Sequence, residues 1–191
     1  MVEKIRCLWA GNNTLMTEYH DKEWGTPVHN DKKLFEFLIL EGAQAGLSWE
    51  TVLKKRENYR KTFHNFDYKK IATYTQKDVK RLLANEGIIR NKLKINATIV
   101  NARKFLEIKK EFGSFDKYIW GFVNGKSIKN KFKKLSEIPA KTEGSEAMSK
   151  ELIKRGFKFV GPTICYAFMQ AVGMVYDHTI DCFRYNEVGK K

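Results

Sequence analysis

Two histidines and two cysteines near the ends of the chain have the residue types of a metal site. The chain holds only four histidines and three cysteines, and the stretch "DHTIDC" places His178 four residues before Cys182. If this stretch is a short helix, both side chains lie on one face and can reach one ion. A structural zinc needs four nitrogen or sulfur donors, and Cys7 and His20, separated by twelve residues, are the candidate second pair.

The same residues also allow a plainer and commoner interpretation, in which the cysteines are buried thiols and the histidines are surface imidazoles. The spacing by itself leaves both interpretations open. The remaining residues of these types fit the plainer one. Cys165 lies in the apolar run "TICYAFMQAVG" and indicates a core thiol, whereas His29 and His64 stand beside asparagines in turn-like sequence.

Helices must position these residues, because apolar residues recur at helical spacing along most of the chain and strand-like alternation is nearly absent. Asp31, Ser48 and Thr75 are candidate helix caps, and Gly113 can end the longest helix. We therefore predict an all-α protein of eight to ten helices. The polar segment 125–145 is the candidate linker between the central helices and the C-terminal part.

The charge of the chain indicates an anionic partner. The 36 lysines and arginines exceed the 22 acidic residues, which gives a net charge of +14. Nucleic acid is the favoured partner over an anionic membrane surface or a role in solubility alone. The basic residues form many short groups, which fits a folded basic face. Neither a secretory signal nor a membrane span is visible, so we expect a cytoplasmic protein with reduced cysteines.

The stretch "RGFKFVGPTICYAF" predicts two helices joined by a tight turn. Gly156 can close the first helix, and Gly161 with Pro162 can open the second. Unpaired N–H groups at the start of the second helix can hold a DNA phosphate without reading the base sequence. Arg155 and Lys158 add positive charge beside the turn. The alternative is an ordinary connection between two helices.

The stretch "LEGAQAGLSWE" has the residue types of a pocket for a flat base that carries an amino group. Glu41 interrupts an otherwise apolar helix, where a carboxylate is costly unless it is paired or used. Small residues follow it and leave room, and Trp49, Trp9, Tyr19 and Trp24 can supply aromatic plates. In the alternative interpretation, Glu41 pairs with a nearby lysine and the tryptophans belong to the core.

Eight short stretches match one protein family, in order and over nearly the whole chain. They are "CLWAG", "YHDKEWG", "LEGAQAGLSWETVLKKRENYR", "GIIRNKLKI", "NARKFL", "FVNG", "RGFKFVGPTICYAFMQA" and "DHTIDC". Together they resemble the bacterial 3-methyladenine DNA glycosylase I family of helix-hairpin-helix glycosylases. The resemblance implies an all-α fold with a structural zinc that ties the N-terminal segment to the C-terminal one. The implied zinc ligands are Cys7, His20, His178 and Cys182.

The resemblance also implies an activity and its site. The expected reaction is hydrolysis of the N-glycosidic bond of 3-methyladenine in double-stranded DNA by a monomeric enzyme, which leaves an abasic site. The residues expected around the base are Glu41, Trp9, Tyr19 and Trp49. The expected DNA contacts are Arg155, Lys158 and Gly161.

One wall of the expected pocket departs from the family pattern. Family members often carry Asp-Pro and an aromatic residue where this chain has Asn13, Thr14 and Met16. We therefore expect this wall to be less aromatic.

Two catalytic groups of the wider superfamily are also missing. Its catalytic Asp aligns with Tyr176, one residue before Asp177, and the nucleophilic Lys of its bifunctional members is replaced after the hairpin glycine by Pro162 and Thr163. We therefore expect a monofunctional enzyme without lyase activity. An iron-sulfur cluster needs four cysteines, and the chain has three.

We expect one domain over residues 1–191. Its central helical lobe covers about 31–124, and segments 1–30 and 145–191 form a lobe with the zinc and the hairpin. Two other functions stay open. One is a non-catalytic, zinc-clasped binder of damaged DNA, and the other is a glycosylase of the same fold with another lesion preference.

Overall fold

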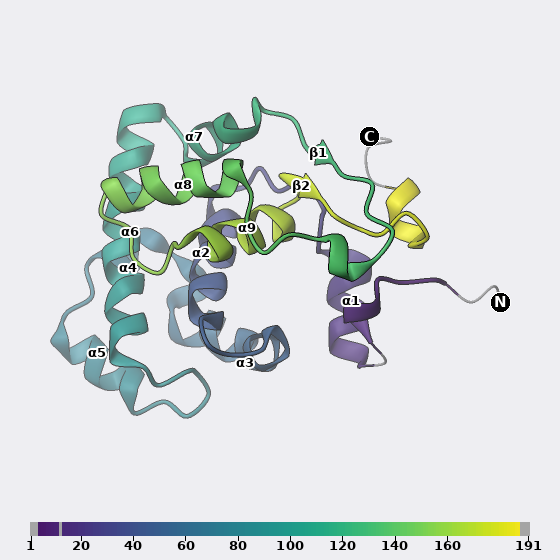
Figure 1. The fold of residues 1–191 in the computed structure, drawn as a ribbon. Coiled ribbons are helices and arrows are strands. Elements are labelled where there is room, and N and C mark those ends of the chain that lie inside the picture. The colour runs from purple at the N-terminus through teal and green to yellow at the C-terminus, as the bar shows by residue number, and fades with distance from the viewer. Residues whose placement is uncertain (1–3, 12, 188–191) are drawn as a thin grey trace.

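The computed structural model describes residues 4–11 and 13–187, and these residues form a helical protein (Figure 1). The expected all-α class is confirmed. The α-helices of the described part are α1 (Thr14–Lys22), α2 (Asp31–Gln44), α3 (Trp49–Thr62), α4 (Tyr68–Ala72), α5 (Gln76–Leu83), α6 (Lys92–Phe112), α7 (Phe115–Trp120), α8 (Glu143–Lys154) and α9 (Pro162–Ala171). Short 3-10 helices are η1 (Leu8–Ala10), η2 (His64–Phe66), η3 (Gly121–Val123), η4 (Leu135–Glu137) and η5 (Phe183–Asn186).

Local capping explains where several helices begin and end. Ser48 caps α3 by accepting from Thr51 N, Thr75 opens α5 in a capping box, and Gly113 ends α6 at a φ of 86°. The cap of α2 was predicted one residue too late, because Asn30 and not Asp31 accepts from the first turn. The carboxylate of Asp31 instead accepts from the backbone N–H of Asp116 at the start of α7.

The stretch 177–182 is not helical, so helical spacing is not what brings His178 and Cys182 together. It follows the short strand β2 (Val175–Tyr176), which pairs in parallel with β1 (Ile128–Lys129). After β2 the chain turns, and Cys182 N donates to Thr179 O over 2.9 Å. Ile180 N also donates to Phe132 O over 2.9 Å, so a contact with a distant segment holds this stretch in a non-helical conformation.

Helix α2 is the centre of the core. Every residue from 34 to 43 is buried, and α2 contacts α3, α6, α7 and α9. A helix that is buried on all sides must satisfy or tolerate each polar group that it carries. The burial of α2 therefore places two acids, Glu36 and Glu41, inside the protein.

The two end segments of the described chain lie on one side of the molecule, next to α1 and β2, while α4, α5 and α6 lie on the opposite side (Figure 1). Phe183 N donates to Ile5 O over 2.9 Å, which joins the two end segments directly. None of the helices within residues 4–11 and 13–187 is both long and apolar enough to cross a membrane.

Gly173, between α9 and β2, has no room for a side chain. Its φ is +73°, and an added Cβ would lie 2.5 Å from Pro27 N. We expect Gly173→Ala to lower the free energy of unfolding by more than about 2 kcal/mol, measured by urea denaturation. The matched control is Gly121→Ala, because Gly121 has an α-helical backbone and open space around it. It should change stability by less than about 1 kcal/mol, and equal losses in both variants would contradict this account.

Candidate functional site

Cys7, His20, His178 and Cys182 form one buried cluster, so their expected grouping is confirmed. Their ligand atoms all lie within 4.8 Å of one another. The Sγ atom of Cys182 is 3.4 Å from His20 Nε2 and 3.5 Å from His178 Nδ1, and Cys7 Sγ is also 3.5 Å from that nitrogen. A tetrahedral ion with bonds of about 2.0–2.3 Å separates its ligands by about 3.3–3.8 Å. The donor set and its spacing therefore fit one tetrahedral metal ion.

Both histidines are oriented by partners on the far side of their rings. His20 Nδ1 lies 2.8 Å from Asp21 Oδ1, and Arg6 holds the same carboxylate at 2.8 and 2.9 Å. His178 Nε2 lies 3.2 Å from the carbonyl oxygen of Trp24. A hydrogen bond at one ring nitrogen leaves the other as a donor to metal. The nitrogens left for the ion are His20 Nε2 and His178 Nδ1.

The cluster also favours a thiolate. Contact with Cys7 holds the pKa of the Cys182 thiol far below its ordinary value, and His178 and His20 act in the same direction against the effect of burial. The same contact, together with burial, raises the pKa of Cys7. These surroundings favour the thiolate at Cys182, and the thiolate is the form of cysteine that binds metal.

A cavity of about 380 Å³ lies beside this cluster and is lined by aromatic rings. The rings of Tyr19 and Trp49 are 5.3 Å apart, and those of Trp9 and Trp24 are 4.9 Å apart. The Trp24 ring also lies 4.6 Å from that of His178. The metal cluster and the cavity thus share a wall, and three of the four rings belong to the residues predicted around the base.

Glu41, from α2, supplies the carboxylate of this cavity. It is only 4% exposed and has no hydrogen bond or ion pair with any residue that the structure describes, so the predicted alternative of a lysine partner is not found there. Burial raises its pKa to about 8, although the charge of Arg56 opposes this. Burial is the main cause that raises the pKa of Tyr19, and the charge of Glu41 raises it further. The two groups therefore interact electrostatically.

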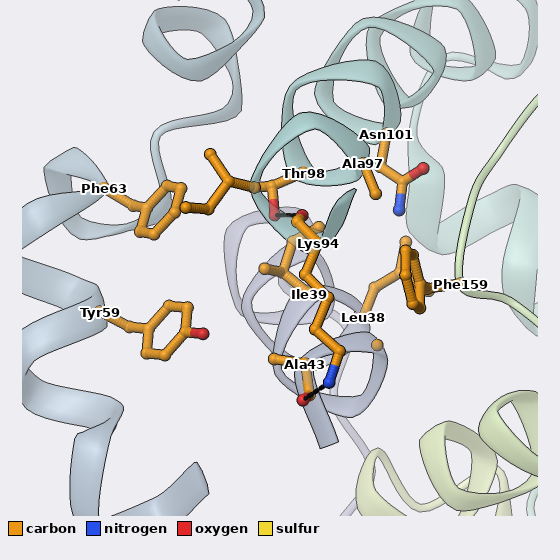
Figure 2. Close-up of a pocket in the computed structure, with 12 residues that line it drawn as sticks. Leu38, Ile39, Ala43, Tyr59, Phe63, Lys94, Ala97, Thr98, Asn101 and Phe159 are labelled. Carbon is orange, nitrogen blue, oxygen red and sulfur yellow. Dashed lines mark hydrogen bonds between the residues drawn. The ribbon is translucent and has the colours of Figure 1, made fainter. Parts of the chain in front are cut away.

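The turn between Glu41 and Trp49 is held by Lys94 from α6. Figure 2 shows its side chain running to the end of α2, where Nζ donates to Ala43 O over 2.8 Å and to Ala45 O over 2.6 Å. A cation at a helix C-terminus satisfies unpaired carbonyls and the helix dipole. The crevice around Lys94 has a volume of about 10 Å³, room for no more than one water. This crevice is therefore too small for a base, whereas the larger cavity of about 380 Å³ has room for one.

The predicted hairpin is present between α8 and α9. Gly156 follows α8 with a φ of +92°, and Gly161 caps α9. Lys158 is exposed on the turn. Arg155, by contrast, binds two glutamates, among them Glu111 over 2.7 Å. The guanidinium of Arg155 is therefore engaged within the protein.

Several residues that line the cavity were not predicted from the sequence. The segment 125–145, predicted as a linker, contributes Leu135 and Ile138 to the lining, and apolar residues within that polar segment were the available signal. Gln170 also lines the cavity and had no such signal. Met16 lines it as well, at the wall expected to be less aromatic.

The fold matches solved structures of DNA glycosylases. A crystal structure of 3-methyladenine DNA glycosylase I superposes with a TM-score of 0.92 at 52% identity and covers 94% of this chain and 98% of that one. The 3-methyladenine DNA glycosylase I of Staphylococcus aureus gives a TM-score of 0.90 at 36% identity and covers 93% and 94% of the two chains. Fold and site together define an all-helical DNA glycosylase.

Sequence comparisons show the family to which the chain belongs. The methyladenine glycosylase family matches residues 9–185. The DNA-3-methyladenine glycosylase of Haemophilus influenzae is 52% identical over 177 residues, which cover 93% of this chain and 96% of that protein. DNA-3-methyladenine glycosylase 1 of Escherichia coli is 53% identical over 180 residues, with coverage of 94% and 96%. The chain belongs to the methyladenine glycosylase family.

The raised pKa of Glu41 predicts a pH-dependent stability. The folded protein keeps this proton up to about pH 8, whereas the unfolded chain loses it near the ordinary value of 4.5. Stability is therefore lost as the pH rises between these values. We expect Glu41→Gln to raise stability by about 2–4 kcal/mol at a pH of about 9 and by much less at a pH of about 5. Urea denaturation at both pH values measures this, and an equal change at both would contradict it.

Proposed function

We propose that this protein hydrolyses the N-glycosidic bond of 3-methyladenine in alkylated DNA, which releases the base and leaves an abasic site. The observation that carries the proposal is the unpaired, buried carboxylate of Glu41 at an aromatic cavity. The curated relatives that cover nearly the whole chain bear the name of this activity. The expected absence of lyase activity belongs to the same proposal.

The chemistry needs little help beyond binding. Methylation at the 3 position makes adenine cationic, so cleavage of its sugar bond releases a neutral base. Each 1.36 kcal/mol of stabilisation gives about a tenfold gain in rate. Rings of Trp49 and Tyr19 can stack on the charged base, and the carboxylate of Glu41 can accept from its amino group. Guanine carries an oxygen where adenine carries this amino group, and the carboxylate of Glu41 would repel that oxygen.

The binding of a cationic base and the charge of Glu41 are linked. A nearby positive charge favours the ionised carboxylate, whereas the empty cavity favours the neutral acid. A base that enters the cavity therefore promotes loss of the proton from Glu41. Below pH 8 the cost of this proton loss weakens binding, so base excision should increase as the pH rises toward that value.

We expect Glu41→Gln to slow release of 3-methyladenine about 10- to 100-fold and to remove most of its pH dependence, because the amide is neutral throughout. Chromatography of bases released from methylated DNA under single-turnover conditions measures both effects. The matched control is Glu57→Gln, an exposed change on α3 that should leave the rate unaltered.

Three results would contradict the proposal or the role given to Glu41. Release by Glu41→Gln at the wild-type rate and pH profile would remove Glu41 from base recognition. No release by a folded, metal-loaded wild type would favour a non-catalytic binder of damaged DNA, which tolerates loss of Glu41. Release of another base would favour the alternative of a different lesion preference.

We infer that the ion in the cluster is zinc with a structural role. Two thiols and two imidazoles suit zinc, and all four positions of a tetrahedron are supplied by the protein. All four ligand residues are buried, which leaves no open position for substrate. Zinc there would join the N-terminal and C-terminal segments.

Zinc removal should therefore act on stability. We expect Cys182→Ala to lower the melting temperature by at least about 10 °C and to abolish the stoichiometric zinc content. Cys165→Ala is the matched control, since Cys165 is equally buried but lies outside the cluster, and its zinc content should stay at one ion. A Cys182→Ala protein that melts normally and loses only activity would indicate a catalytic metal instead.

We also propose that the helix-hairpin-helix unit binds double-stranded DNA. Lys158 is exposed on the turn, and the N-terminus of α9 at Gly161 offers unpaired N–H groups to a phosphate. Arg155 was predicted as a third contact, and it would have to exchange its glutamates for DNA. The net charge of +14 supports an anionic partner.

The organisation of the protein fits this function. In the two-lobe division that we propose, Glu41 and Trp49 come from the lobe at about 31–124, whereas Trp9 and Tyr19 come from the lobe that includes 1–30. The base would then bind between the lobes of a single domain. We further propose a monomer that acts in the cytoplasm, where the thiols of the cluster stay reduced.

A further inference from the structure

A fully buried carboxylate lies directly behind the cavity. Asp177, just after β2, accepts three hydrogen bonds, from Asn130 Nδ2 at 2.7 Å, Tyr166 OH at 2.6 Å and Gln170 Nε2 at 2.8 Å. Tyr166 and Gln170 are four residues apart on α9 and therefore lie on one face of that helix. Both of them line the cavity.

Asp177 decides which way the amide of Gln170 faces. A carboxylate only accepts hydrogen bonds, so the amide must turn its NH₂ group toward Asp177 and its carbonyl oxygen away from it. That oxygen, Oε1, has no hydrogen-bond partner among residues 4–11 and 13–187, and Gln170 itself is only half-buried. The residue thus offers an unused acceptor where it borders the cavity.

We propose that Gln170 is a specificity-determining residue of the pocket and that Asp177 is the residue that positions it. With Oε1 turned to the base, Gln170 supplies a second acceptor beside that of Glu41. An amino group has two N–H donors and can satisfy both acceptors, whereas a carbonyl oxygen can satisfy neither. The pair thereby favours an alkylated base that carries an amino group over one that carries an oxygen at the same position.

This role differs from that of a catalytic acid. The three hydrogen bonds to Asp177 occupy its carboxylate, and the side chain is 0% exposed, so it is not free to touch the substrate. Of its two partners that line the cavity, Gln170 is the one whose free acceptor Asp177 orients. The inference rests on the proposed function and adds a basis for discrimination between bases.

The test is the ratio of affinities for two free bases, 3-methyladenine and 3-methylguanine, measured by calorimetry on the zinc-loaded protein. We expect Gln170→Met to lower this ratio at least about tenfold, because the acceptor is lost while the volume is kept. Asp177→Asn should lower this ratio similarly. An amide at position 177 can donate as well as accept, so the amide of Gln170 is no longer held in one orientation. Asn130→Ala is the matched control, since it removes a hydrogen bond to Asp177 without touching Gln170, and its ratio should stay within about twofold of wild type.

The outcomes separate this inference from the proposed function. Zinc content and melting temperature are recorded for each variant, and Gln170→Met provides the result if Asp177→Asn does not fold. Wild-type protein that binds neither base overturns both proposals. Wild-type protein that prefers 3-methyladenine, with an unchanged ratio in Gln170→Met, overturns this inference alone. If Gln170 and Asp177 had a purely structural role, their substitution would weaken the binding of both bases by the same factor.

Discussion

The contact between the two ends of the chain, through the buried cluster of Cys7, His20, His178 and Cys182, is the interaction on which the pocket depends. His178 is 171 residues away from Cys7 in sequence, yet their ligand atoms are 3.5 Å apart. His178 in turn contacts both the backbone and the ring of Trp24, and the Trp24 ring packs against Trp9. Two aromatic walls of the cavity are thus held in place by contact with this cluster.

The two buried acids of α2, Glu36 and Glu41, have opposite surroundings. Glu36 accepts from Arg56 and Arg60, and these arginines, with Lys33, hold its pKa below the ordinary value even though burial acts against them. Glu41, five residues later, has no such partner and its pKa is raised. An unpaired buried carboxylate lowers stability, and a fold tolerates such a cost where the group has a function. The contrast within one helix supports the proposed role of Glu41 in base recognition.

Charged side chains outside the cavity hold polar groups of the site in place. Asp21 orients His20, Lys94 holds the end of α2, and Asp177 holds the amide of Gln170. In each case the supporting group is charged. His20 belongs to the cluster, Gln170 borders the cavity, and the end of α2 follows Glu41. A site held in this way keeps its geometry before a ligand arrives, which reduces the entropy lost on binding.

The sequence by itself determined the helical class, several helix caps and the residue types of the site. These features are local, since a cap at Ser48 or a glycine stop at Gly113 depends on a few neighbouring residues. Tertiary structure decided what depends on distant partners. Three examples come from distant parts of the chain: Phe132, whose backbone oxygen accepts from Ile180 within 177–182, the glutamate that engages Arg155 from 44 residues away, and Asn130, which donates to Asp177. Periodicity carries no information about such contacts, because they form only when separate elements pack together.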